Sequence, residues 1–87
     1  MTVYMVERNL KGISMQDLGA AQQAAIAKSA ELTGRGVPVR YIRTTFTPGD
    51  GCCLCLFEAG SETAVRSVND EAGLPYQRVV EALDLTP

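Results

Sequence analysis

The chain has 87 residues, of which 46% are hydrophobic, so it is long enough for one small domain and too short for two. Eight basic and ten acidic residues give a net charge of −2. Because the basic residues are scattered, we expect neither a nucleic-acid-binding nor a membrane-binding surface. No apolar run approaches the roughly 20 residues of a membrane span. The first residues alternate in polarity, unlike a signal peptide, so we expect a cytoplasmic protein with reduced thiols.

The first half of the chain predicts a strand, a long helix and a second strand. Residues 2–8 are rich in β-branched and aromatic side chains, which favour strands. Ser14 can cap the helix that follows, because its hydroxyl can accept hydrogen bonds from the free N–H groups of the first turn. An Ala- and Gln-rich run extends this helix to about Thr33, and Gly34 stops it. Residues 39–47 predict the second strand.

The second half predicts a strand, a helix and a last strand. The turn cluster at residues 48–51, Pro-Gly-Asp-Gly, separates the second strand from a third at residues 52–59. Ser61 can cap a second helix, which Gly73 ends. Residues 79–85 predict the fourth strand. All three cysteines therefore lie on the third strand, in a hairpin with the second.

The order βαββαβ is typical of a ferredoxin-like fold of the α+β class. Two right-handed crossovers and one hairpin give a four-stranded antiparallel sheet with two helices on one face and with the first and third strands at its centre. The sequence contains no linker that would divide it. Residues 1–87 are therefore predicted to form a single ferredoxin-like domain.

Alternation along the strands predicts which side chains the helices cover and which lie on the open face, the side of the sheet without helices. The mid-strand charges of Glu7, Arg43 and Glu81 are expected to avoid the covered side, because an unpaired buried charge is costly. The side chains predicted beneath the helices are Val6, Ile42, Phe46, Cys52, Leu54, Leu56, Val80 and Ala82. Those predicted on the open face are Met5, Tyr41, Cys53, Cys55, Phe57, Val79 and Leu83. Such a face is too apolar to remain in water, so we expect a homodimer that buries it.

The three cysteines offer soft metal ligands in a chain without histidine. Cys53 and Cys55 share a face with Cα atoms about 6.6–7 Å apart, which is the outer limit for a disulfide but suits a shared metal ion. Because there is no second cysteine pair, we do not expect a closed tetrahedral site within one subunit. A site across a dimer, or one completed by Glu7, Tyr41, solvent or backbone, stays open. So does a purely structural role as small buried hydrophobes.

Catalytic machinery is not indicated. No histidine is present to activate a cysteine or serine nucleophile. The carboxylates of Glu7 and Glu81 are a candidate acid–base pair only if their strands are adjacent. The turn at residues 49–51 lacks the length and the lysine of a phosphate-binding loop. We therefore assign no catalytic residue and favour a binding protein over an enzyme.

Short motifs spread along the chain match those of one known family. The motifs are Tyr4, Glu7-Arg8, Leu10 and Gly12 in the pattern Y-x-x-E-R-x-L-x-G, the run from Tyr41 to Thr47, the run from Cys55 to Ala59, Ala64-Val65-Arg66 and Gly73-Leu74-Pro75. The chain thereby resembles a family of small bacterial proteins of unknown function that includes an actinobacterial nickel-binding protein with a dimeric ferredoxin-like fold. The resemblance spans nearly the whole sequence.

The resemblance implies a small dimeric protein that binds nickel or another divalent metal. The family's cysteine in the third strand falls on Cys55, its aromatic residue in the second strand falls on Tyr41, and its first glutamate falls on Glu7. Cys53 joins this set because it shares a face with Cys55. The metal ligands implied for this chain are Cys55, Cys53, Glu7 and Tyr41.

Two positions depart from the family. Many of its members carry histidines where this chain has Arg43 and Val68, and nickel favours imidazole among mixed ligands. Either the metal depends on thiolate and carboxylate, or the fold persists without it. The alternative function is a dimeric ferredoxin-like small-molecule-binding protein or enzyme with a pocket between sheet and helices, where Arg43 could hold an anionic ligand. A dimeric module without chemistry is the third interpretation.

Overall fold

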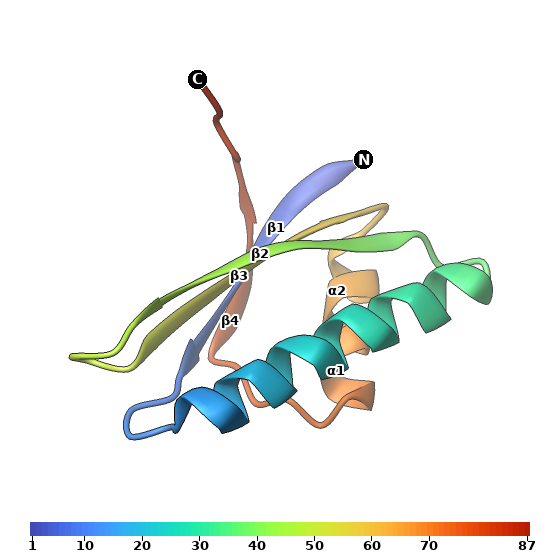
Figure 1. Ribbon diagram of the computed structural model, residues 1–87. Helices are drawn as coiled ribbons and strands as arrows, with labels where there is room; N and C mark the ends of the chain where they lie inside the picture. The colour runs from blue at the N-terminus through green and yellow to red at the C-terminus, as the bar shows by residue number, and fades with distance from the viewer.

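The computed structural model describes all 87 residues. In chain order the elements are β1 (Thr2–Asn9), α1 (Met15–Gly34), β2 (Val39–Thr47), β3 (Cys52–Ala59), α2 (Glu62–Glu71) and β4 (Arg78–Ala82). The strands form one antiparallel sheet in the order β2-β3-β1-β4, and both helices cover the same face of it (Figure 1). The predicted ferredoxin-like α+β fold, with β1 and β3 at the centre, is confirmed.

Both helices begin at the predicted caps. The Ser14 Oγ accepts a hydrogen bond from the Asp17 backbone N–H at 3.0 Å, and the Ser61 Oγ accepts one from the Ala64 N–H at 3.2 Å. These bonds satisfy donors that a first helical turn otherwise leaves free. The last strand is shorter than predicted, because β4 ends at Ala82. Neither helix is long and apolar enough to cross a membrane.

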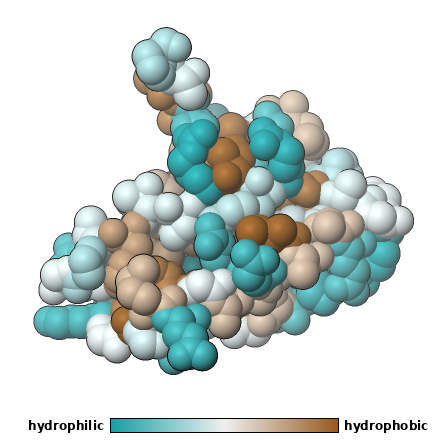
Figure 2. Space-filling view, viewed as in Figure 1, coloured by the Kyte–Doolittle hydropathy of each residue, from teal (hydrophilic) through white to brown (hydrophobic).

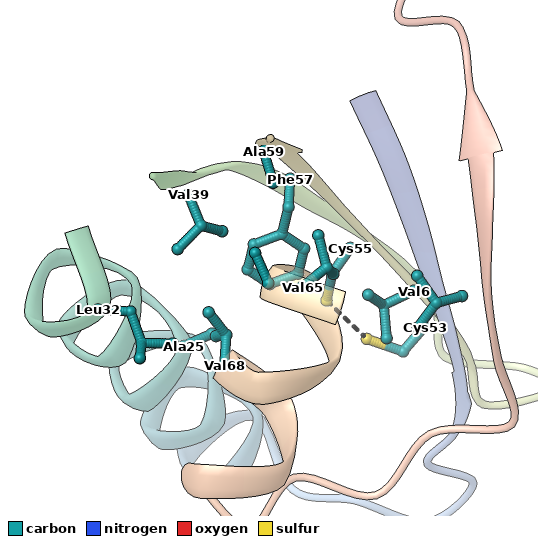
Figure 3. Packing of buried hydrophobic residues seen from close by; sticks show 12 residues of the cluster. Val6, Ala25, Leu32, Val39, Cys53, Cys55, Phe57, Ala59, Val65 and Val68 are labelled. Atoms are coloured by element: carbon teal, nitrogen blue, oxygen red, sulfur yellow. Dashed lines mark hydrogen bonds between the residues drawn. The ribbon is translucent and has the colours of Figure 1, made fainter. Parts of the chain in front are cut away.

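The hydrophobic core lies between the sheet and the helices (Figure 3). Phe57 of β3 and Val6 of β1 are completely buried at its centre. The core consists of Val6, Ala25, Leu32, Val39, Cys53, Cys55, Phe57, Ala59, Ala64, Val65, Val68 and Val79. Most of these side chains are small, so the helices lie close to the sheet.

The structure reverses the predicted faces of β3. Cys53, Cys55 and Phe57 lie beneath the helices and are buried. Leu54 and Leu56 lie on the open face instead and are half-buried. Because side chains alternate strictly along a strand, one wrong choice of face moves every residue of the strand to the wrong side.

Two residues of β3 account for its orientation. Glu58 has the same parity as the two leucines, and on the open face its carboxylate forms an ion pair with Arg40 at 3.2 Å. Phe57 supplies the large ring that fills the space beneath the helices. Cys52, which was predicted to lie beneath the helices, shares the parity of Glu58 and lies on the open face.

The outer strands also differ from the prediction. A bulge between Tyr41 and Arg43 shifts the alternation of β2, so that Tyr41 packs against the core while Arg43 stays on the open face as predicted. On β4, Val79 pairs with Val6 and is buried. Val80, and not Val79, therefore lies on the open face.

The open face is apolar at its centre. It carries Val3, Met5, Leu54, Leu56, Val80 and Ala82. Glu7 pairs there with Arg78 at 2.8 Å. Arg43 of β2 pairs at 2.6 Å with Asp84, which follows β4, so this ion pair spans the sheet between its two edge strands. Figure 2, in the view of Figure 1 with α1 in front, shows apolar and hydrophilic groups intermixed over the surface and the C-terminal end of the chain standing clear of it.

Candidate functional site

The thiols of Cys53 and Cys55 lie side by side beneath the helices. Both residues belong to β3, and their Sγ atoms are 3.8 Å apart (Figure 3). Their exposed fractions are 1% and 4%, so neither thiol is freely accessible from bulk solvent. The prediction that the two share a face is confirmed, although the face is the covered one.

Arg8 of β1 is a buried cation beside this thiol pair, with an exposed fraction of 4%. Its Nη2 donates to the Asn69 Oδ1 at 2.9 Å and contacts the Cys55 Sγ at 3.4 Å. Its Nη1 donates to the Pro75 carbonyl at 3.3 Å. Six ion pairs form in the molecule and none includes Arg8. The guanidinium is thus hydrogen-bonded but has no anionic partner.

A chain of hydroxyl groups reaches Cys55 from the other side. The Thr44 Oγ1 lies 3.1 Å from the Cys55 Sγ and 2.6 Å from the Tyr41 hydroxyl oxygen. The Gln22 amide of α1 donates to the same Tyr41 oxygen at 2.9 Å. Tyr41 and Thr44 are three residues apart and would face opposite sides of a regular strand. The bulge in β2 brings them to one side.

A cavity of about 220 Å³ lies between α1 and the sheet, next to these groups. Its lining combines a majority of apolar side chains with one arginine, one threonine and one glutamine. The lining residues are Arg8, Leu10, Met15, Leu18, Ala21, Gln22, Ala25, Thr44, Phe46, Cys53 and Cys55. Met15, the first residue of α1, is exposed, so the cavity reaches the surface at the start of that helix.

Burial governs the ionisation of Cys53. It raises the pKa of this thiol from the ordinary 9.0 to about 11, and the adjacent Cys55 adds to the rise through its charge and its hydrogen bond. The cationic Arg8 acts in the opposite direction. Cys53 is therefore a neutral thiol at pH 7, and a metal ion that binds it must displace the proton.

The structure does not bring all four predicted metal ligands together. Cys53, Cys55 and Tyr41 lie on the covered side of the sheet, where the Tyr41 hydroxyl is linked to Cys55 through Thr44. Glu7 lies on the open face, paired with Arg78, so its carboxylate cannot join the thiols within one protomer. No three His, Cys, Asp or Glu side chains lie close enough to hold one metal ion together.

The sequence analysis did not identify Arg8, Thr44 and Asn69 as site residues. A signal for Arg8 was present, because it follows Val6 by two positions on a central strand and must share its buried face. Asn69 follows Val65 by one helical turn on the apolar side of α2. Thr44 had no such signal, because its position depends on the bulge.

The family model described as nickel responsive protein SCO4226-like matches residues 4–82. The crystal structure of SCO4226 from Streptomyces coelicolor A3(2) is similar to this structure, with a TM-score of 0.81 and 25% sequence identity over 97% of this chain and 99% of that one. No curated protein matches the sequence.

Proposed function

Because the chain belongs to the nickel-responsive SCO4226-like family, we propose that it is a small nickel-binding protein with Cys53 and Cys55 as thiolate ligands. The observation that carries this proposal is the 3.8 Å separation of the two Sγ atoms. Two thiolates on a tetrahedral metal ion with bonds of about 2.3 Å also lie about 3.8 Å apart. The pair therefore needs little rearrangement to hold one ion.

Burial keeps the Cys53 thiol neutral until a metal ion displaces its proton, and two groups beside Cys55 can stabilise a metal-bound thiolate. Arg8 lies 3.4 Å from the Cys55 Sγ, and a nearby cation stabilises a thiolate. The Thr44 hydroxyl, at 3.1 Å from the same atom, can donate a hydrogen bond to it. Solvent and the Tyr41 hydroxyl are the remaining candidate ligands in this protomer. Glu7, on the opposite face, is not part of the site that we propose.

Nickel titration of cysteine variants tests this assignment. We expect calorimetry on the reduced protein to detect binding, and Cys53→Ser and Cys55→Ser each to weaken it by at least tenfold, because a neutral hydroxyl is a poor substitute for a thiolate. Cys52→Ser is the matched control and should bind like the wild type, since Cys52 lies on the open face. A thiolate-to-nickel charge-transfer absorption should accompany binding. No binding by the wild type, or full binding by both serine variants, would refute the proposal.

We further propose that the protein is a cytoplasmic homodimer joined through its open face. The three cysteines are free, which suits a reducing compartment. Apolar side chains at the centre of the open face, with charges of both signs around them, allow a second copy to pack against it by two-fold symmetry. The residues that support the dimer differ from those predicted, because Tyr41, Cys53, Cys55, Phe57 and Val79 face the helices.

A second candidate function is favoured by the cavity. A cavity of about 220 Å³ with a mostly apolar lining and a few convergent polar groups is the usual form of a small-molecule site, although it is smaller than most. Arg43, the residue expected to hold a ligand in such a pocket, lies on the open face and cannot reach it. The cation at this cavity is Arg8.

A further inference from the structure

We propose that the cavity between α1 and the sheet binds a small organic monocarboxylate, with its carboxylate on Arg8 and its apolar body along α1. This inference rests on the second candidate function, the small-molecule pocket, and does not depend on metal binding.

The positive charge of Arg8 has no negative counterpart within the chain. A buried cation is costly unless an anion compensates it, and the acceptors that surround this guanidinium are an amide oxygen, a carbonyl oxygen and a thiol sulfur. None of them carries a full charge when Cys55 is a thiol. A planar guanidinium matches a carboxylate by geometry as well as by charge. A bound carboxylate would supply the partner that the chain itself does not.

The composition of the cavity wall suits a ligand with one negative charge and an apolar body. Eight of its eleven lining residues are hydrophobic and none is acidic, so an anion meets no repulsion and an apolar body meets no unpaired polar group. Thr44 and Gln22 add further hydrogen-bonding groups to the cavity wall. The first turn of α1, which includes Met15 and Leu18, borders the cavity.

The cavity suits a monocarboxylate better than a dianion such as inorganic phosphate. The cavity lining contains one basic residue, so a dianion would retain a second charge without a partner in an apolar enclosure. The cavity also provides few donors for the oxygens of a phosphate, which usually binds several N–H groups. A single carboxylate on an apolar body uses both the cation and the hydrophobic wall.

Benzoate and hexanoate, with benzamide and hexanamide as neutral counterparts, are suitable probes. The titration is done on full-length reduced protein in the presence of a chelator, so that its outcome does not depend on metal. We expect at least one carboxylate to shift the backbone amide resonances around Leu18 and Thr44, and its amide to bind at least tenfold more weakly. Inorganic phosphate should leave these resonances unchanged.

Two variants locate the binding site, and a third serves as a control. Arg8→Met should weaken carboxylate binding by at least tenfold, because it keeps the side-chain bulk and removes the charge. Ala21→Phe fills the cavity without touching the charge and should also abolish binding, which keeps the test decisive if Arg8→Met does not fold. Arg40→Met removes an exposed arginine of the open face and should bind like the wild type.

The outcomes distinguish a failure of the carboxylate inference from a failure of the small-molecule pocket on which it rests. If carboxylate and amide bind equally well, the pocket stands and the inference about charge is wrong. If neither binds, both the pocket and the inference are wrong. Binding that survives in both Arg8→Met and Ala21→Phe would place the carboxylate elsewhere and overturn the inference.

Discussion

Arg8 and Asn69 join the centre of the sheet to α2 through a hydrogen bond of 2.9 Å between the guanidinium Nη2 and the amide Oδ1. Both residues are almost completely buried, with exposed fractions of 4% and 0%. The Asn69 Nδ2 donates to the Val65 carbonyl at 2.8 Å, which directs the amide oxygen toward Arg8. Asn69 therefore holds the guanidinium beside Cys55 at the wall of the cavity.

Removal of this amide should destabilise the fold. Asn69→Ala leaves a buried guanidinium with one acceptor fewer and opens a space beneath α2, so we expect a loss of roughly 2–4 kcal/mol in the free energy of unfolding. Urea denaturation of wild type and variant measures it. Asn9→Ala is the control, because Asn9 is exposed and accepts one bond from the Lys11 N–H at 3.2 Å; it should cost less than about 1 kcal/mol. Equal losses would show that the buried amide has no special role.

The burial of Cys53 makes the stability of the protein depend on pH in the alkaline range. Its folded-state pKa is raised from 9.0 to about 11, so the native state retains a proton that the unfolded chain releases. The contribution is complete below about pH 9 and is lost as the pH rises toward 11. A shift of about two units corresponds to at most about 3 kcal/mol.

Comparison of two alanine variants isolates this effect from the other groups that titrate above pH 9. Urea denaturation at pH 7, 9 and 10.5, under reducing conditions, should show a smaller alkaline decline for Cys53→Ala than for the wild type. Cys52→Ala should decline as the wild type does, because Cys52 lies on the open face. The same slope in all three proteins would contradict the assigned cause.

Gly51 is the last residue of the turn between β2 and β3. It packs against Lys11, in the loop between β1 and α1. It has a φ of +74°, and a Cβ at this position would overlap the backbone of Lys11. Its carbonyl accepts the Leu10 N–H at 2.8 Å, and Leu10 lines the cavity. We expect Gly51→Ala to cost about 3 kcal/mol or more of stability, because the strain and the overlap add.

Gly36 is the matched control for this substitution. It has a φ of +90°, but no atom lies within 4 Å of a Cβ placed there. Gly36→Ala should therefore cost only the conformational strain, about 1 kcal/mol. Thermal or urea denaturation of the two variants measures the difference, and similar losses would show that the contact with Lys11 is unimportant.

The sequence predicts the architecture because its signals are local. Ser14 and Ser61 cap their helices by bonds to residues three positions further on, and the glycine- and proline-containing turns separate the strands where the structure has them. The order of elements then leaves few topologies. The register within the sheet is not local, and there the prediction was less successful.

The face of β3 was mispredicted because hydrophobicity alone does not decide which side of a central strand is buried. Two leucine side chains offer more apolar surface to bury than two cysteines, but Glu58 shares the parity of the leucines and its charge belongs in solvent. The bulge in β2 left no sequence signal, so the inward position of Tyr41 was not predictable. Cys53 and Cys55 were placed side by side correctly, because strict alternation requires it.

The open face seen in the structure identifies a residue whose substitution tests the proposed homodimer. Leu56 lies at its centre, between Met5 of β1 and Arg43 of β2. A glutamate at this position would place a charge, at the cost of desolvation, in the middle of an apolar interface. We therefore expect Leu56→Glu to weaken the dimer by at least tenfold. The helices lie on the other side of the sheet, so the fold itself should persist, as circular dichroism can check.

Light scattering at micromolar concentration gives the mass of each form. The wild type should be a dimer and Leu56→Glu a monomer. Ile26→Glu, which alters an exposed apolar residue on α1, should remain dimeric because it lies on the helical side. A monomeric wild type would refute the dimer. A monomer from Ile26→Glu together with a dimer from Leu56→Glu would place the interface on the helices.

Tyr41→Glu is unsuitable for this test. The Tyr41 hydroxyl bonds to Thr44 and Gln22 beneath α1, so a charge there would disturb the fold of the protomer, whatever surface forms the dimer interface.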